Sequence, residues 1–127
     1  MFSADQLILH LVGDYILQTD HMAQYKSQKT WVAFLHAFVY SLPFLWICDS
    51  PAALFVIFFS HGIIDRFRLA RYVAMIKNIA GDPIHHKIYR TQTGYPENTP
   101  AWVAGWLFVI VDNTMHLVIN GLAIYYL

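Results

Sequence analysis

The sequence predicts an all-α integral membrane protein, a bundle of four apolar helices whose basic loops both face the cytoplasm. Three observations predict this fold class: the composition, four long apolar stretches, and the confinement of every lysine and arginine to two connecting loops. Hydrophobic residues make up 57% of the chain and charged residues only 13%, whereas soluble domains average about 45–50% and about 25%. With 127 residues, we expect a single membrane domain over residues 1–127.

Four apolar stretches define the predicted helices. They cover residues 4–17, 31–48, 51–67 and 102–127. A membrane-spanning helix needs about 20 apolar residues, within a range of about 17–25. The last stretch is long enough to cross with tilt, and the middle two are at the short end. The first is short and polar, so a re-entrant or deeply buried helix is the alternative there.

The connections between the stretches differ in length and character. Only Asp49 and Ser50 separate the second stretch from Pro51, which suits the first turn of a helix, so the two middle helices should form a tight antiparallel hairpin. Residues 18–30 have the composition of a polar loop. Residues 66–79 alternate basic and apolar side chains at helical spacing, so they either extend the third helix or lie along the membrane surface.

The basic residues predict the orientation of the bundle. Lys26 and Lys29 lie in the first loop, and the remaining six of the eight lie in the third: Arg66, Arg68, Arg71, Lys77, Lys87 and Arg90. Because positive side chains are retained in the cytoplasm, both loops should be cytoplasmic and both termini outside. The formal net charge is zero, so membrane lipid rather than nucleic acid is the expected partner.

Ionisable side chains also lie inside the apolar stretches. An aspartate in the middle of a membrane costs about 2.5–3.5 kcal/mol, so each such group indicates a function or a counter-charge. Three of these histidines lie four residues from an aspartate, which puts both members of each pair on one helix face. Every stretch contributes to the set, which consists of His10, Asp14, His36, His61, Asp65, Asp112 and His116.

This set of imidazoles and carboxylates predicts a metal site. Such ligands suit zinc, manganese or iron, and seven ligands are enough for one or two divalent ions. Two ions that share an aspartate and a bridging water are used to hydrolyse phosphate or acyl bonds. The alternatives are a proton or ion pathway and a structural hydrogen-bond network between helices.

Several polar residues are expected next to the metal ligands. His36 stands alone on its stretch, so it is either a ligand or a hydrogen-bond partner of one, together with Tyr40. Gln6, Asn113 and Asn120 are further candidates for the surroundings of the ligands. An alternative for each of them is helix packing.

Two groups of residues would take part in catalysis. Asp14 or Asp65, whichever is not committed to metal, would act as general base on the attacking water. Basic side chains of the third loop could hold a phosphate group, although juxtamembrane basic residues often only contact anionic lipid. These side chains are Arg66, Arg68, Arg71, Lys87 and Arg90.

The order and spacing of these residues resemble a known family. The matching residues are His10-Leu11-Val12-Gly13-Asp14, Gln18, Met22-Ala23, Lys26, His36, His61-Gly62-Ile63-Ile64-Asp65, Asp112 and His116. They are similar to the small bacterial and phage membrane proteins grouped as domain-of-unknown-function family 3307, and residues 111–117 resemble phage-encoded members. More distantly, the pattern resembles membrane proteins labelled as predicted metal-dependent hydrolases. The resemblance implies a multi-pass protein of a bacterial, or host, inner membrane.

We therefore expect a membrane-embedded, metal-dependent hydrolase that acts on a lipid-linked or phosphate-bearing substrate near the cytoplasmic leaflet. The alternative is a non-enzyme, either an ion or proton carrier or a small membrane protein that modulates a host complex. A bundle of this size has little interior, so a homodimer is a further expectation to test.

Overall fold

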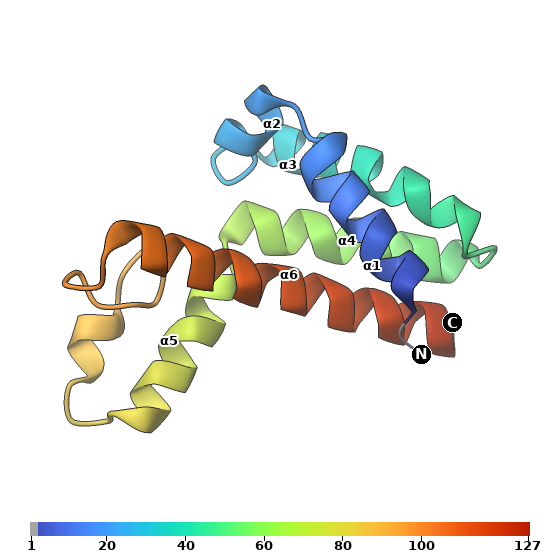
Figure 1. Cartoon of the computed structure of the whole chain (residues 1–127). Helices are drawn as coiled ribbons and strands as arrows, with labels where there is room; N and C mark the ends of the chain where they lie inside the picture. Colours follow the sequence, from blue (N-terminus) through green and yellow to red (C-terminus); the bar gives the residue numbers. More distant parts are fainter. Residues whose placement is uncertain (1–2) are drawn as a thin grey trace. The chain divides into compact units, whose positions relative to one another are not determined.

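The protein is all-α, as the sequence predicts. The computed structural model describes residues 3–127, and within that range it contains helices and no strand (Figure 1). The α-helices are α1 (Ala4–Leu11), α2 (Asp20–Tyr25), α3 (Thr30–Ser41), α4 (Pro51–Phe67), α5 (Ala70–Gly81) and α6 (Ala101–Tyr126). Three shorter helical segments join them: η1 (Val12–Ile16), η2 (Leu42–Trp46) and η3 (His86–Tyr89).

The chain forms two compact units, which we describe one at a time. The first unit comprises residues 3–67 together with His116–Leu127, and the second comprises Arg68–Met115. Helix α6 therefore begins in the second unit and ends in the first. The single membrane domain over residues 1–127 stays a prediction.

The predicted four membrane-spanning helices are not supported. Among the residues described, only α6, with 26 residues, is long and apolar enough to cross a membrane. The other predicted spans are shorter as helices: α1 has 8 residues, α3 has 12 and α4 has 17. Each of the first two apolar stretches is interrupted, and the interruptions have identifiable causes.

The first stretch changes from an α-helix to a wider π-helical turn. Ser3 caps α1, since its hydroxyl accepts a hydrogen bond from the backbone N–H of Gln6 at 3.2 Å. The turn η1 then closes with the N–H of Leu17 donating to the carbonyl of Val12, five residues earlier, at 2.9 Å. Single π-helical turns of this kind are frequent at functional sites.

The second stretch is interrupted by a proline. Pro43 lies in η2, where it has no N–H to continue the α-helical hydrogen bonds of α3, and the chain tightens into a 3-10 helix. A short turn then leads to Pro51 at the first position of α4, and α3 packs along α4 (Figure 1). The tight helical hairpin predicted from residues 49–51 is confirmed.

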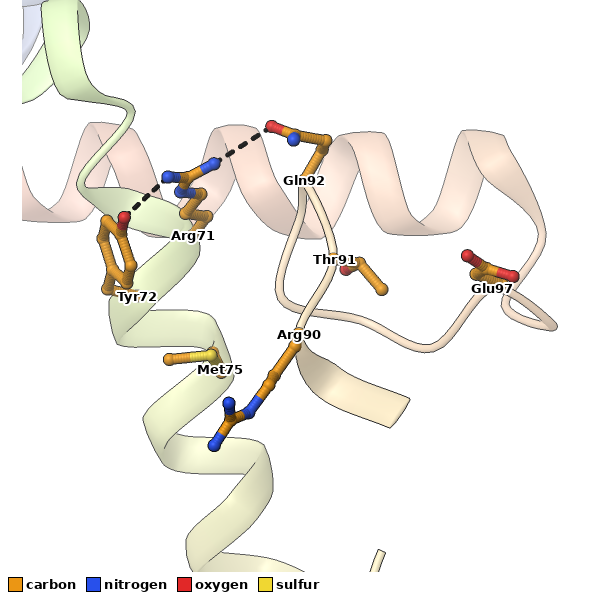
Figure 2. A pocket seen from close by; sticks show the side chains of 7 residues that line it. All are labelled: Arg71, Tyr72, Met75, Arg90, Thr91, Gln92 and Glu97. Atoms are coloured by element: carbon orange, nitrogen blue, oxygen red, sulfur yellow. Dashed lines mark hydrogen bonds between the residues drawn. The ribbon is translucent and has the colours of Figure 1, made fainter. Parts of the chain in front are cut away.

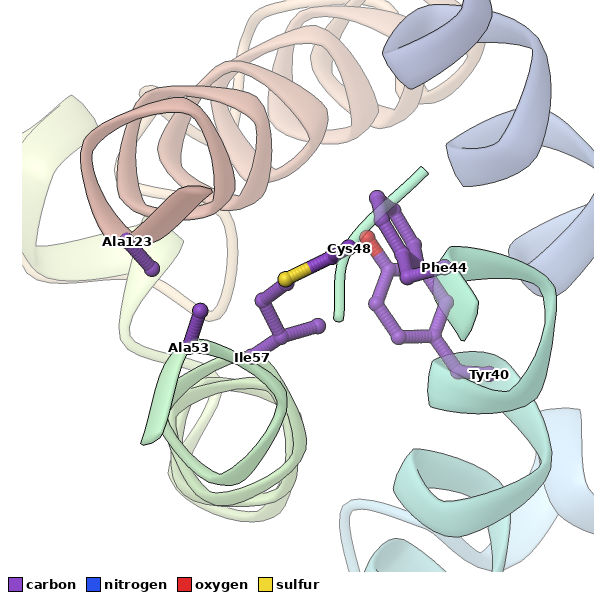
Figure 3. Close-up of a cluster of buried hydrophobic side chains, with 6 residues drawn as sticks. All are labelled: Tyr40, Phe44, Cys48, Ala53, Ile57 and Ala123. Atoms are coloured by element: carbon purple, nitrogen blue, oxygen red, sulfur yellow. The ribbon is translucent and has the colours of Figure 1, made fainter. Parts of the chain in front are cut away.

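Buried apolar side chains hold together the end of this hairpin where the chain turns from α3 to α4. Helices α3, α4 and α6 and the segment between the first two contribute to one cluster (Figure 3). The cluster consists of Tyr40, Phe44, Cys48, Ala53, Ile57 and Ala123. This apolar cluster fills one end of the first unit. The buried polar side chains of that unit form another group, which is described below.

The two loops that carry basic residues are more helical than expected. Residues 18–30, predicted as a polar loop, contain the short helix α2, which Thr19 caps through a 3.3 Å hydrogen bond from the N–H of Met22. Residues 66 and 67 end α4, Arg68 and Leu69 form a turn, and residues 70–79 belong to the separate helix α5. Arg68 has a positive φ of 50°, a conformation that ends one helix before α5 begins.

In the second unit, a loop is pressed against α5. Gly94, with a φ of 78°, lies so close to α5 that an added Cβ would come within 2.6 Å of the Arg71 carbonyl oxygen and of the Met75 nitrogen. The Asn78 amide donates to the Gly94 carbonyl oxygen at 2.8 Å, and buried Tyr95 packs with Ala74 and Ala104. The loop around residues 93–96 is thus held against α5.

Candidate metal centre

Four ionisable side chains meet inside the first unit, and we call them the four-residue cluster. They are Asp14 on η1, His36 on α3, and His61 and Asp65 one turn apart on α4. Both histidines are fully buried, and both aspartates are 5% exposed. The sequence predicted that these residues converge, and the structure confirms it.

The atoms of the four-residue cluster lie within coordination distance of a common centre. The Nε2 atoms of His36 and His61 are 3.0 Å apart. Asp14 Oδ1 lies 3.1 Å from the first and 3.3 Å from the second. Asp65 Oδ2 lies 3.4 Å and 3.2 Å from the same two atoms. One ligand atom from each residue can be chosen so that all four lie within 4.8 Å of one another.

These separations fit a tetrahedral ion. Zinc binds imidazole nitrogen and carboxylate oxygen at about 2.0–2.2 Å, so two ligand atoms of a tetrahedral site lie about 3.3–3.6 Å apart. The five distances above, from 3.0 to 3.4 Å, need to widen by only a few tenths of an ångström. The residues therefore suit a divalent ion with two nitrogen and two oxygen ligands.

Protons alone do not satisfy this arrangement well. If both Nε2 atoms carried a proton, the two N–H groups of His36 and His61 would face each other across 3.0 Å. If only one or neither did, at least one nitrogen lone pair would face both carboxylates. A cation between the four groups removes this conflict, and both Nε2 atoms then act as lone-pair donors.

Lys26, which directly follows α2, contacts one of the two carboxylates, that of Asp65. Lys26 Nζ lies 2.9 Å from Asp65 Oδ2, and the lysine side chain is 21% exposed. Two carboxylates and one ammonium leave the group with a formal charge of −1, which also favours a bound cation. From the sequence, Lys26 predicts the orientation and matches the family pattern but does not predict a contact with Asp65, although Thr19 and the polar first turn of α2 indicate a helix that could position it.

The second oxygen of each carboxylate in the four-residue cluster faces a further histidine. His10 Nδ1 lies 3.5 Å from Asp14 Oδ2, and His116 Nε2 lies 3.5 Å from Asp65 Oδ1. In this structure both histidines are thus placed to orient the carboxylates, and their role as ligands stays a prediction. Asp112 is half-buried on α6 within the second unit, so its predicted role as a ligand also stays a prediction.

Tyr40 supports two of these histidines. Its hydroxyl lies 2.7 Å from His10 Nδ1 and accepts a 2.6 Å hydrogen bond from the Asn120 amide. Its ring stacks on His61 with centroids 3.6 Å apart. The sequence suggested Tyr40 as a partner of His36 beside the metal ligands, whereas in the structure the Tyr40 hydroxyl contacts His10.

The sequence candidates for the surroundings of the ligands have different positions. Asn120 is buried and is connected to the four-residue cluster through Tyr40, which contacts both His10 and His61. The Gln6 amide donates to the Leu117 carbonyl oxygen at 2.7 Å and so joins α1 to α6. Gln6 therefore has a helix-packing role.

The basic residues predicted to hold phosphate divide between the two units. The Arg66 guanidinium donates to Thr30 Oγ1 at 3.0 Å and to the Ser27 carbonyl oxygen at 2.9 Å, so it fastens the start of α3. The others lie in the second unit, where Arg71 and Arg90 line a hollow and Lys87 lines a neighbouring one. Arg68 contacts the Gln92 carbonyl oxygen at 3.3 Å and the ring of Phe108.

The fold and the site define an all-α protein whose buried histidines and aspartates could hold a metal ion. The model of the family described as "Protein of unknown function (DUF3307)" matches residues 2–126, so the chain belongs to this family. No curated protein and no solved structure matches the chain. The resemblance to the family is thereby confirmed, and the resemblance to membrane hydrolases stays a prediction.

Proposed function

We propose that this chain is a membrane-embedded, metal-dependent hydrolase that acts on a lipid-linked or phosphate-bearing substrate. The observation that carries the proposal is the convergence of Asp14, His36, His61 and Asp65, two nitrogens and two oxygens at the separations of a divalent-metal site. Zinc, manganese and iron all accept this ligand set, and one ion accounts for the four-residue cluster.

Membrane embedding is supported by the distribution of polar and apolar side chains in the first unit. Its interior holds polar side chains such as His10 and His36, while large apolar side chains such as Ile16, Phe55 and Trp46 are 74%, 62% and 88% exposed. A water-soluble protein seldom exposes so much contiguous apolar surface. Lipid would cover these side chains, and α4, with 17 residues, is at the lower limit for a span of about 17–25.

We further propose that the loops with lysine and arginine face the cytoplasm of a bacterial cell and that both termini lie outside. All eight basic residues occur before α3 or between the last turn of α4 and the start of α6, and such residues are retained on the cytoplasmic side. Lys26, at the end of α2, would then mark the cytoplasmic face of the metal site. The substrate would approach from that leaflet.

The catalytic roles follow from the contacts of the carboxylates. A bound divalent ion would supply a Lewis acid and, by expanding from four to five ligands, would bind and acidify a water. Asp14 would hold the ion through Oδ1, and its Oδ2, which lies beside His10, would accept a proton from the attacking water. The partly exposed Lys26 would draw a phosphate oxygen toward Asp65. The oxygen of water bonds to phosphorus, the bond to the leaving-group oxygen breaks, and that oxygen takes the proton.

A proton or ion carrier is the second candidate, and one observation favours it. Polar contacts run from partly exposed Lys26 to Asp65, through the two central histidines to Asp14, and on through His10 to Tyr40 and Asn120. Such a chain of titratable groups is typical of proton pathways in membranes.

The two candidates differ in what they do in lipid vesicles. For the hydrolase, protein reconstituted with zinc or manganese should cleave a phosphodiester such as bis(p-nitrophenyl) phosphate. Chelation should abolish this cleavage and added metal should restore it. A carrier should instead move protons or metal into sealed vesicles. Asp14→Asn should abolish either activity, with the exposed Asp49→Asn as the matched control. Flux without cleavage would overturn the hydrolase proposal.

A further inference from the structure

We propose that the second unit binds a phosphate ester in a hollow between α5 and residues 90–97. This site is built entirely within Arg68–Met115. It goes beyond the proposed hydrolase function, because it does not require a metal at the four-residue cluster.

The hollow has the size of a small-molecule site and a basic lining. Its volume is about 570 Å³, within the range of about 300–1,000 Å³ for ligand pockets. Figure 2 shows its lining side chains, which come from α5 and the facing loop: Arg71, Tyr72, Met75, Arg90, Thr91, Gln92 and Glu97. A neighbouring hollow of about 460 Å³ shares Arg90, Thr91 and Glu97 and adds Lys87.

Arg71 is held in place by neutral partners that leave its charge available. Its Nη1 donates to Gln92 Oε1 at 3.1 Å and its Nη2 to the Tyr72 hydroxyl at 2.6 Å (Figure 2). A guanidinium has five N–H groups, and each Nη atom of Arg71 keeps one N–H after these two bonds. The planar fork is therefore oriented with donors left for an anion.

No carboxylate neutralises the cations of the two hollows. Within residues 3–127, no ion pair involves Arg71, Arg90 or Lys87. The one acidic lining residue, Glu97, lies on the opposite side of the hollow from Arg71 in Figure 2. Three cations against one carboxylate favour an anionic ligand.

The loop that carries Arg90 and Gln92 is fixed on α5, so the hollow is preformed. Thr91 Oγ1 donates to the Tyr95 carbonyl oxygen at 2.7 Å and accepts from the Gly94 N–H at 3.0 Å. The close approach of Gly94 to α5 holds the other end of this turn. A preformed site loses little conformational freedom when a ligand binds.

The shape and lining indicate a phosphate ester rather than a bare phosphate ion. A phosphate group occupies only part of a hollow of this volume. With phosphate on Arg71, the remaining space reaches Glu97, whose carboxylate can accept hydrogen bonds from hydroxyl groups of the organic part. A glycerol phosphate has this chemistry, and it occurs both as a free metabolite and in phospholipid headgroups.

Calorimetric titration tests the proposal on a metal-free background. The full chain with Asp65→Asn, purified in dodecyl maltoside with chelator, is titrated with inorganic phosphate and with glycerol 3-phosphate. We expect both to bind, with the ester tighter. Arg71→Gln should weaken binding about tenfold or more, because a charge-assisted bidentate contact is lost. Arg71→Lys should weaken it less, since it keeps the charge but not the fork.

Lys77→Gln is the matched control, because it removes one positive charge from α5 without touching the hollow. It should leave binding unchanged. If Arg71→Gln fails to fold, Arg90→Gln, an exposed position, replaces it and should also weaken binding. Absence of binding by both probes, or equal loss in Lys77→Gln, would overturn the proposal.

A second arm identifies the source of the phosphate ester. The same protein is placed in nanodiscs of phosphatidylcholine with or without phosphatidylglycerol and titrated with glycerol 3-phosphate. Competition by phosphatidylglycerol identifies a lipid headgroup as ligand, and its absence identifies a soluble ester. Because the metal site is disabled throughout, phosphate binding here and failure of metal binding or hydrolysis remain separable results.

Discussion

Replacing Asp65 by asparagine removes one of the two carboxylates of the four-residue cluster while keeping the shape of the side chain. Asp65 Oδ2 contacts both central histidines, at 3.4 and 3.2 Å, and Lys26 at 2.9 Å. We expect the variant to lose zinc binding, because one of four ligands becomes a neutral amide and the formal charge of the group rises by one.

The magnitude can be worked out for the thermal midpoint. At zinc concentrations about 100 times the dissociation constant, binding stabilises the native state by about 2.7 kcal/mol. For a chain of this length, 1 kcal/mol raises Tm by about 4 °C, so zinc should raise the Tm of the unsubstituted protein by about 10 °C. Asp65→Asn should show a shift near zero.

The metal-free variant will itself be less stable. Breaking a buried ion pair costs about 3–5 kcal/mol, and the 21% exposure of Lys26 places this pair at the lower end. The measured quantity is therefore the zinc-induced shift in each protein, by differential scanning fluorimetry in detergent. Asp49→Asn, an exposed carboxylate in the same unit, is the control. A full zinc shift in Asp65→Asn would refute the assignment of this carboxylate.

Two further predictions concern packing and a surface titration. Gly13→Ala should lower the free energy of unfolding by about 1–3 kcal/mol in a denaturant titration, because the new Cβ would lie 2.5 Å from the buried Tyr40 ring. Gly105→Ala, where a Cβ meets open space, is the control and should not lower it. Equal destabilisation by both substitutions would contradict this prediction. The hydrogen bond from the Tyr89 hydroxyl to Asp82 Oδ2, at 3.0 Å, lowers the pKa of Asp82. The stability that ionised Asp82 contributes is therefore complete above the usual carboxyl pKa, and it is lost as the pH falls through the lowered pKa. Tyr89→Phe should raise the pKa of Asp82 toward normal in a carbonyl NMR titration, and an unchanged value would exclude this cause.

The site was predictable from sequence where helical periodicity decides side-chain positions. His61 and Asp65 are four residues apart within α4, the one stretch whose helix has the predicted limits, so both point to the same side. The cost of isolated charges in an apolar helix then predicted that Asp14 and His36 would join them. Both inferences rest on local geometry and on desolvation.

Other features depended on interactions that no spacing reveals. The π-helical turn at Gly13 arises where Tyr40 packs against the backbone, a tertiary contact. The contact of Lys26 with Asp65 requires α2. The low apolar content of residues 18–30 predicts a loop there instead of this helix. The sequence predicts longer apolar helices than the structure contains, because composition alone does not show that the helix tightens at Pro43.

X-ray absorption spectroscopy of the purified, zinc-loaded protein tests the central claim most directly. We predict one zinc per chain with four nitrogen and oxygen ligands at about 2.0–2.2 Å, including the multiple scattering of two imidazoles from His36 and His61. A spectrum of hydrated zinc without imidazole, or an unchanged spectrum in His61→Gln, would contradict the four-residue metal centre.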